Sequence, residues 1–181
     1  MKREELEHVI RAAVDIVDDE LVVLGSQAIL AGHPDAPESL LRSVEVDLYP
    51  LNHPERADEI DGAIGDGSQF HETYEYYAHG VGPETAVAPA GWQERAIRLE
   101  LPAIRRSGRA AVAWCMAPHD LVLAKLAAGR AHDVQFATDA IREGLVEPSQ
   151  LELGIALMPA SHRDVTRERL AIAVGRSAGA Q

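Results

Sequence analysis

The stretch VVLGSQAILAGHPDAPESLLRSVEVDLYP, residues 22–50, places two apolar segments on either side of a turn and a proline-containing loop. The first segment, ELVVLGS, is typical of a buried strand that ends at Gly25, and SQAILA predicts a helical turn that begins at Ser26. GHPDAPES combines prolines, a glycine and small polar residues, which favours a loop, and SVEVDLY alternates as a strand does. The stretch therefore predicts two strands joined by a helical turn and a loop.

Two acidic residues, Glu45 and Asp47, stand one residue apart in the second of these strands. Successive side chains of a strand alternate between its faces, so both carboxylates point to one side while Val44, Val46 and Leu48 point into the core. Two like charges this close cost free energy unless a cation neutralises them, and Mg²⁺ binds through one or two carboxylates plus substrate phosphates. The pattern predicts a magnesium site; the alternative is a strand whose polar face meets solvent.

The pair Gly25-Ser26 lies between the first strand and the helical turn. A glycine lets the backbone approach a phosphate closely, and the N–H groups at the start of a helix bind anions. Together with the two carboxylates, the pair predicts a phosphate cradle beside a metal clamp. A nucleophilic role for Ser26 is disfavoured, because GSQAI lacks the flanking glycines of a nucleophile elbow.

The remaining chain supplies further strands and many helices. Residues 4–18 and 54–64 predict helices, whereas the second half of FHETYEYYAHGVG, then ERAIRLELP and AAVAWCM, predict strands. From Pro118 onward the pattern is helical: one long helix or two short helices interrupted near Gly129, followed by two more. We expect an α/β (α+β) fold, with a small mixed sheet and flanking helices in residues 1–116 and a helical C-terminal part of the same domain in residues 117–181.

Composition limits the classes of partner and the cellular location. Seventeen Lys and Arg against 29 Asp and Glu give a net charge of -12, which disfavours broad nucleic-acid or anionic-membrane binding. No apolar run approaches the ~20 residues that span a bilayer, and we expect a cytoplasmic protein without a membrane partner. The single cysteine, Cys115, lies in an apolar setting typical of a buried structural thiol.

Several smaller patterns add expectations about surface and loop residues. The eight histidines show no metal-ligand spacing, so we expect surface or capping roles for them. Trp92 is expected to pack on the core from a loop. One segment concentrates positive charge and is either a solvated basic loop or a local RNA contact; its arginines are Arg95, Arg98, Arg105, Arg106 and Arg109.

The Gly-Ser pair, the loop and SVEVDLY together resemble the signature of the nucleotidyltransferase superfamily. APHDLVLAKLAAGRAHDVQFATDAI is similar to the helical motif of nucleotidyltransferase-like proteins related to the toxins of AbiE-type toxin–antitoxin systems. The resemblance covers residues from about 22 to 143. It implies that Glu45 and Asp47 bind Mg²⁺, and that an NTP binds to Gly25 and Ser26 and to the helical residues Lys125, Arg130 and Asp133.

Two features depart from the pattern that the resemblance implies. The gap between Ser26 and the first acidic residue is longer than in compact members, and that residue is Glu45 where Asp is commoner. Active members also carry a third carboxylate on a later strand, for which Glu100 is the best match. A two-metal mechanism depends on that third carboxylate.

The helical motif can be examined as one continuous helix. Lys125, Gly129 and Asp133 would then share one face, and Lys125 and Asp133 would lie roughly 12 Å apart at 1.5 Å per residue, too far for an ion pair. Lys125 would contact a phosphate, and Arg130 and Asp133 could pair locally. A surface lysine and a surface salt bridge are the alternatives for these residues.

These observations predict a Mg²⁺-dependent nucleotidyltransferase, with catalytic Glu45, Asp47 and Lys125, that transfers a nucleoside monophosphate from an NTP to RNA, a protein or a small molecule. The resemblance further implies a toxin with a cognate antitoxin as partner. The alternative is a catalytically silent nucleotidyltransferase fold used as a binding module, and a third interpretation is an α/β domain whose acidic pair only meets solvent.

Overall fold

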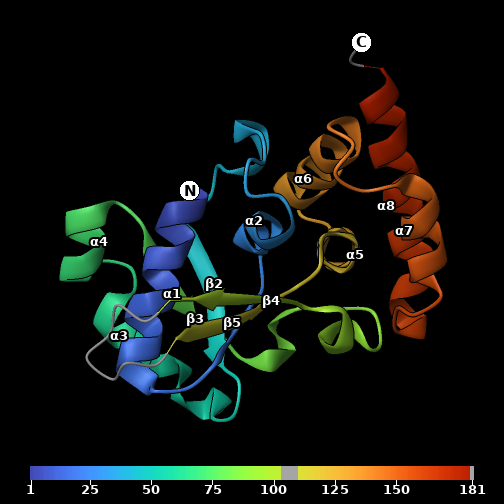
Figure 1. Ribbon diagram of the computed structural model, residues 1–181. Helices are drawn as coiled ribbons and strands as arrows, with labels where there is room; N and C mark the ends of the chain where they lie inside the picture. Colours follow the sequence, from blue (N-terminus) through green and yellow to red (C-terminus); the bar gives the residue numbers. More distant parts are fainter. Residues whose placement is uncertain (103–109, 180–181) are drawn as a thin grey trace.

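The computed structural model describes residues 1–102 and 110–179 of the chain. A five-stranded mixed sheet forms its centre, in the strand order β3-β2-β1-β5-β4 (Figure 1). The strands are β1 (Leu21–Val23), β2 (Glu45–Pro50), β3 (Tyr77–Gly80), β4 (Ile97–Leu101) and β5 (Ala111–Cys115). β1 pairs antiparallel with β2 and parallel with β5, β2 pairs parallel with β3, and β4 pairs antiparallel with β5. The α/β class and all five predicted strands are confirmed.

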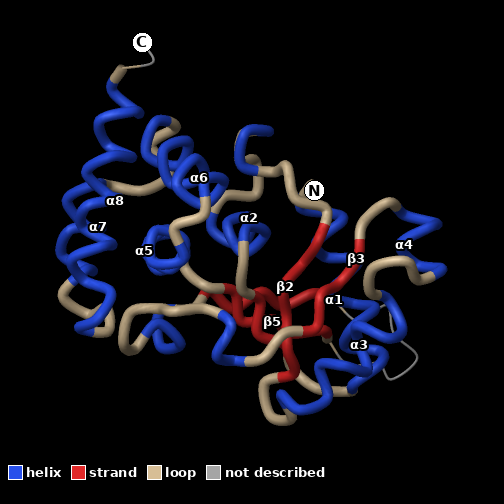
Figure 2. The backbone as a smooth tube through the Cα atoms, turned by 180° about the vertical axis from the view of Figure 1, so that it is seen from behind, coloured by secondary structure: helices blue, strands red, loops and turns tan. Residues whose placement is uncertain are grey.

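Eight α-helices surround the sheet within the described residues. They are α1 (Arg3–Val17), α2 (Ile29–Gly32), α3 (Ala57–Ile64), α4 (Gln69–Tyr74), α5 (Pro118–Ala128), α6 (Ala131–Arg142), α7 (Pro148–Ile155) and α8 (Ala160–Ala178). Short 3₁₀ turns are η1 (Ser26–Ala28), η2 (Glu38–Leu40), η3 (Pro54–Arg56), η4 (Pro83–Thr85) and η5 (Trp92–Arg95). Both views show the strands in the middle, with α5 to α8 on one side and α3 and α4 on the other (Figure 2). None of the described helices is long and apolar enough to cross a membrane.

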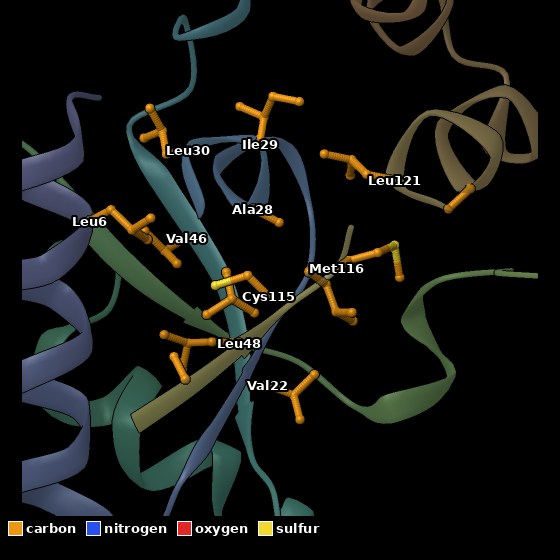
Figure 3. Packing of buried hydrophobic residues seen from close by; sticks show 14 of the residues in the cluster. Leu6, Val22, Ala28, Ile29, Leu30, Val46, Leu48, Cys115, Met116 and Leu121 are labelled. Atoms are coloured by element: carbon orange, nitrogen blue, oxygen red, sulfur yellow. The ribbon is translucent and has the colours of Figure 1, made fainter. Parts of the chain in front are cut away.

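The core forms where helices cover the sheet. Figure 3 shows Leu6 of α1, Ile29 and Leu30 of α2 and Leu121 of α5, which belong to the same core cluster as the strand residues Val46 and Leu48; all of them are 0–1% exposed. Cys115 is fully buried and burial raises the pKa of its thiol to about 12, which confirms a structural thiol. Trp92 is also buried, as predicted.

The prediction for Val44 is wrong. Val46 and Leu48 are fully buried as expected, but Val44 is 46% exposed because β2 begins only at Glu45. Alternation fixes the direction of a side chain only within a paired strand, and Val44 precedes that pairing. The two carboxylates are unaffected, since both lie inside β2.

The C-terminal helical pattern breaks at Gly129, so two short helices, not one long helix, form here. Gly129 has φ 70°, and its N–H donates to the Lys125 carbonyl at 2.8 Å. A left-handed glycine after the last turn is a common helix ending. The Arg169 guanidinium of α8 donates to the Leu126 and Ala127 carbonyls at 2.8 and 2.7 Å, which satisfies the open end of α5. Gly144 similarly adopts φ 69° just after α6.

The basic segment predicted from sequence is only partly described. Arg95 donates to both Asp120 carboxylate oxygens at 2.9 and 2.8 Å, and Arg98 pairs with Glu100. Arg105, Arg106 and Arg109 lie outside the described residues. The two described arginines of this segment are therefore neutralised by carboxylates of the same chain.

Candidate functional site

A cavity of about 490 Å³ opens beside the ends of β1 and β2. Its wall combines the Gly25-Ser26 turn, Glu45 and Asp47 of β2 and His79 of β3 with side chains of α5 and α6, residues 85–87 and His162 of α8. This volume falls within the roughly 300–1,000 Å³ of small-molecule sites. Of the residues predicted for the site, the structure gathers Gly25, Ser26, Glu45, Asp47, Lys125, Arg130 and Asp133 around this one cavity.

The two β2 carboxylates are each bonded to the residue directly opposite on β3. The parallel register pairs Glu45 with Tyr77 and Asp47 with His79. The Tyr77 hydroxyl donates to Glu45 Oε2 at 3.0 Å, and His79 Nδ1 lies 3.0 Å from Asp47 Oδ1. Because successive residues alternate, both acids and both partners lie on the same face of the sheet. β3 therefore fixes the two carboxylates toward the cavity.

Electrostatics at this pair favour a bound cation. Burial raises the pKa of Asp47, the hydrogen bond with His79 opposes the rise, and the Glu45 charge adds to it. Burial and the bond to Glu45 raise the pKa of Tyr77 to about 12, so its phenol stays protonated and donates at neutral pH. A carboxylate whose charged form is disfavoured in this way is stabilised when a cation binds nearby.

Gly25 brings the first strand end against this acidic pair. It has φ 65° and ψ -171°, a region open essentially to glycine alone. A Cβ at this position would collide with Asp47 Oδ2. The Leu24 N–H donates to the Asp47 carbonyl at 2.9 Å, which holds the two backbones together. The group that Gly25 approaches within the described residues is therefore Asp47, and the approach of Gly25 to a phosphate stays a prediction.

The prediction that Lys125 and Asp133 lie too far apart to pair is wrong. Lys125 Nζ lies 3.0 Å from Asp133 Oδ1 and 4.8 Å from the centre of the Phe136 ring. The turn at Gly129 folds α6 back toward α5, so the two residues face each other across two helices. Both are buried, at 8% and 0% exposure. Lys125 is thus an ion-paired lysine at the cavity wall.

Asp133 receives a second cation from Arg130. Arg130 Nε lies 2.7 Å from Asp133 Oδ2, which confirms the local pair, although Asp133 is buried where a surface bridge was the alternative. Burial opposes ionisation of Asp133, but Arg130 and Lys125 outweigh it and lower its pKa. The Arg130 side chain is 67% exposed, so its guanidinium also faces solvent in the cavity.

The structure does not bring Glu100 to this site. Glu100 lies on β4, and β1 and β5 separate β4 from β2, which is about 14 Å at roughly 4.8 Å per strand spacing. It pairs with Arg98. Within residues 1–102 and 110–179, no three His, Cys, Asp or Glu side chains are placed to hold a metal ion. Glu45 and Asp47 supply hard oxygen donors, which fit Mg²⁺ when substrate phosphates complete its coordination.

Comparison with known proteins identifies the family to which the chain belongs. A family model described as a nucleotidyltransferase of unknown function (DUF6036) matches residues 3–158. The chain belongs to this nucleotidyltransferase family. No curated protein and no solved structure matched the chain. The nucleotidyltransferase resemblance noted in the sequence is confirmed at the level of the superfamily, and the likeness to AbiE-type proteins stays a prediction.

Four residues at the candidate site were not predicted from the sequence. Tyr77 and His79 alternate in YYAHG, and that alternation was the available signal, but their partners on β2 depend on strand order. His132 and His162 line the cavity from α6 and α8. Single histidines in helices carry no spacing signal, so a surface role was expected for them.

Proposed function

We propose that this protein is a Mg²⁺-dependent nucleotidyltransferase that transfers a nucleoside monophosphate from an NTP to an acceptor. One observation carries the proposal: Glu45, Asp47 and the Gly25-Ser26 turn line one cavity, in a chain that the nucleotidyltransferase family model matches. Glu45 and Asp47 would hold Mg²⁺, with the orientation set by Tyr77 and His79. When bound, the ion neutralises phosphate charge and polarises the α-phosphate.

The other wall of the cavity supplies positive charge to the phosphates. Gly25 and Ser26 border the triphosphate, and the exposed Arg130 guanidinium suits phosphate oxygens because of its planar set of donors. Lys125 contributes its charge from the cavity wall, where it is ion-paired with Asp133. These residues position the nucleotide and stabilise the charge that develops as pyrophosphate leaves.

The acceptor oxygen forms a bond to the α-phosphorus as the bond to the bridging oxygen breaks. Pyrophosphate leaves with the bonding electron pair, and the proton of the acceptor hydroxyl passes to a base or to water. Catalysis of this kind depends mainly on positioning and electrostatics. The net charge of -12 disfavours a polyanionic acceptor such as RNA, and so does the pairing of Arg95 and Arg98 with carboxylates.

A thermal-shift titration with each of the four NTPs, with and without Mg²⁺, tests the metal-nucleotide site. At 100 times the Kd a ligand stabilises the native state by about 2.7 kcal/mol, which raises Tm by roughly 5–10 °C for a chain of this size. We expect this shift in the wild type with Mg²⁺ and its loss in Asp47→Asn. Asp58→Asn, an exposed carboxylate of α3 that does not line the cavity, is the matched control. An equal shift in Asp47→Asn would refute the metal site.

A catalytically silent nucleotidyltransferase fold is the second candidate function. Glu100 lies on β4, at the opposite edge of the sheet from β3, and this position favours the silent fold, since active members carry a third carboxylate at the site. This alternative predicts nucleotide binding without turnover. Incubation with an [α-³²P]NTP and a cell extract distinguishes the two, because only an enzyme transfers label to another molecule.

The toxin role rests on the likeness to AbiE-type proteins. It predicts that expression without a cognate antitoxin arrests growth of a bacterial host, and that Asp47→Asn relieves the arrest. Growth curves of strains expressing wild type, Asp47→Asn and Asp58→Asn at matched levels measure this. Equal toxicity of wild type and Asp47→Asn would separate any growth defect from nucleotidyl transfer.

A further inference from the structure

A second cavity, of about 260 Å³, adjoins the first. The two share a boundary made of Ser26, Ser43, Lys125 and His132. Ser26 belongs to the turn that borders the triphosphate in the proposed function, so the second cavity adjoins the place where the phosphates would lie. A molecule bound there would reach the nucleotide at its phosphates.

The second cavity is built by the long connection between Ser26 and Glu45. This connection places η2 against α6, and the lining comes from both: Ser39, Leu40, Arg42 and Ser43 on one side and Gln135, Phe136 and Asp139 on the other. The length of this connection was the departure from compact nucleotidyltransferases noted in the sequence. The added residues therefore form a distinct chamber beside the nucleotide site.

The charges of the second cavity leave one cation without a partner. Asp139 is bonded to Arg142 at 2.8 Å and to Gln135 at 3.0 Å, and Lys125 is paired with Asp133. Arg42 is exposed and makes no hydrogen bond or ion pair with any residue that the structure describes. The guanidinium group matches carboxylate and phosphate groups geometrically, so the second cavity favours an anion.

Other lining groups fit the remainder of a small organic molecule. Leu40 and Phe136, both nearly buried, offer contact to carbon atoms. The buried Ser39 hydroxyl oxygen has no hydrogen-bond partner in the described part of the chain, and an occupant of the cavity could supply one. The volume is below the range of about 300–1,000 Å³ for typical ligand pockets, so the occupant is smaller than a nucleotide.

We propose that the second cavity is the acceptor site and takes a small anion that bears a hydroxyl group. The proposal rests on the proposed nucleotidyl transfer. Arg42 binds the anionic group, and the hydroxyl points across the shared boundary toward the α-phosphate. The preference for a small molecule over RNA or protein follows from the volume of the cavity and its single unpaired cation.

His132 is the proton acceptor for this hydroxyl. It is the boundary residue that carries an imidazole, the side chain that most often serves as a general base in enzymes, whereas Lys125 is held in an ion pair with Asp133. Its ring is 69% exposed, and its Nε2 lies 3.6 Å from Asp133 Oδ1. That carboxylate would stabilise the imidazolium after proton transfer.

The balanced step involves one bond formed and one broken. The acceptor oxygen bonds to the α-phosphorus and its proton passes to the His132 imidazole. The bond between the α-phosphorus and the bridging oxygen breaks, and pyrophosphate takes the electron pair. The product is a phosphodiester when the acceptor hydroxyl is an alcohol.

The test uses the full chain, Mg²⁺ and an equimolar mixture of the four [α-³²P]NTPs. The probe acceptors are sn-glycerol 3-phosphate and D-glycerate, with glycerol as the uncharged control and total tRNA as the polymeric alternative. We expect label on at least one of the two anions and none on glycerol or tRNA. Label on tRNA alone, or on neither anion in a preparation that binds nucleotide, would overturn the acceptor assignment.

Variants separate the two roles in the second cavity. Arg42→Gln should raise the KM for the anionic acceptor at least about 10-fold with the nucleotide Kd within about twofold, because only the acceptor contact is lost. His132→Gln should lower kcat about 100-fold or more with both binding constants within about twofold. Arg176→Gln, an exposed arginine of α8 outside both cavities, should match the wild type. An unchanged acceptor KM in Arg42→Gln would refute its role, and an unchanged kcat in His132→Gln would refute the proton transfer.

Failure of this proposal is distinguishable from failure of the proposed function. If the wild type binds no nucleotide with Mg²⁺, the nucleotidyl transfer itself is wrong and the acceptor site falls with it. If the wild type binds nucleotide and Asp47→Asn does not, the metal site stands, and the labelling pattern decides the acceptor alone. Melting curves of each variant confirm that it is folded before the comparison is made.

Discussion

The same cavity holds two acidic centres that are stabilised in opposite ways. Glu45 and Asp47 receive bonds from a phenol and an imidazole, and the pKa of Asp47 is raised. Asp133 forms ion pairs with the Lys125 ammonium and the Arg130 guanidinium, and its pKa is lowered. The first centre keeps uncompensated negative charge that a cation can use, whereas the second is neutralised within the protein. Acidic residues at one site can therefore serve binding and structure separately.

The largest loss of folding stability should follow from removing the charge of Asp133. Asp133→Asn removes the charge that compensates buried Lys125, and loss of one partner of a buried pair costs about 3–5 kcal/mol. Urea unfolding gives this free energy, with Asp58→Asn as the exposed control. Asp47→Asn, in contrast, should leave stability at or above that of the wild type, because it removes a buried and repelled charge. A deficit below about 1 kcal/mol in Asp133→Asn would contradict a structural ion pair.

The contributions of Asp133 and Asp47 to stability should depend on pH in opposite directions. Because the pKa of Asp133 is lowered on folding, its contribution is fully present above the unfolded value of about 3.9 and is lost as the pH falls from there through the lower folded pKa. Because the pKa of Asp47 is raised, its contribution is present below about 3.9 and is lost as the pH rises through the folded value.

Unfolding free energies measured between pH 3 and 7 test these opposite signs. The deficit of Asp133→Asn should shrink as the pH falls below about 3.9, because Asp133 of the unfolded wild type then takes up a proton that the folded protein binds only at lower pH. Asp47→Asn should gain on the wild type as the pH rises above about 4. Parallel curves for both variants would show that neither carboxylate is perturbed by folding.

A smaller effect should come from moving Asp47 without changing any charge. Gly25→Ala places a Cβ against Asp47 Oδ2 and strains a backbone with φ 65°, at a cost of about 1–3 kcal/mol. Gly67→Ala is the matched control, because Gly67 has φ 72° and a Cβ there meets no other atom within 4 Å. Both should lower Tm, but only Gly25→Ala should abolish the Mg²⁺-nucleotide shift. Retention of that shift would show that the acidic pair tolerates displacement.

The smallest effect should come from removing the hydrogen bond between Tyr77 and Glu45. Tyr77→Phe removes one hydrogen bond, which is worth about 0.5–1.5 kcal/mol, and frees the carboxylate to rotate. We expect about a fivefold weaker Mg²⁺-dependent nucleotide Kd by calorimetry. Tyr74→Phe, whose hydroxyl makes no hydrogen bond within the described residues, should bind as the wild type does. Unchanged binding in Tyr77→Phe would mean that β3 does not position the acidic pair.

Much of the fold and half of the site could be read from the chain. The Gly-Ser turn and the alternation of SVEVDLY predicted the strand ends, and the position of Glu45 and Asp47 on one face followed from a period of two. The prediction for Val44 failed because the start of a strand depends on pairing with a neighbour. The register of β2 with β3 begins at Glu45, and Val44 takes part only through its carbonyl, which accepts from the Tyr77 N–H.

The other half of the site depends on contacts between distant segments. The pairing of Lys125 with Asp133 needed the turn at Gly129, whose effect on helix direction has no periodic signal. The absence of Glu100 from the cavity followed from strand order, because β1 and β5 lie between β4 and β2. Neither the Lys125–Asp133 pair nor the position of Glu100 could be predicted from neighbouring residues in the sequence.

The sequence by itself determined the local chemistry: a glycine at the strand end, two carboxylates on one face of β2, and a net charge that opposes polyanions. These depend on interactions between residues a few positions apart, which sequence spacing encodes directly. Only the tertiary structure decided which partner bonds to which acid, because Tyr77, His79 and Lys125 reach their carboxylates through strand pairing and helix packing. Long-range packing sets those distances, and spacing along the chain does not.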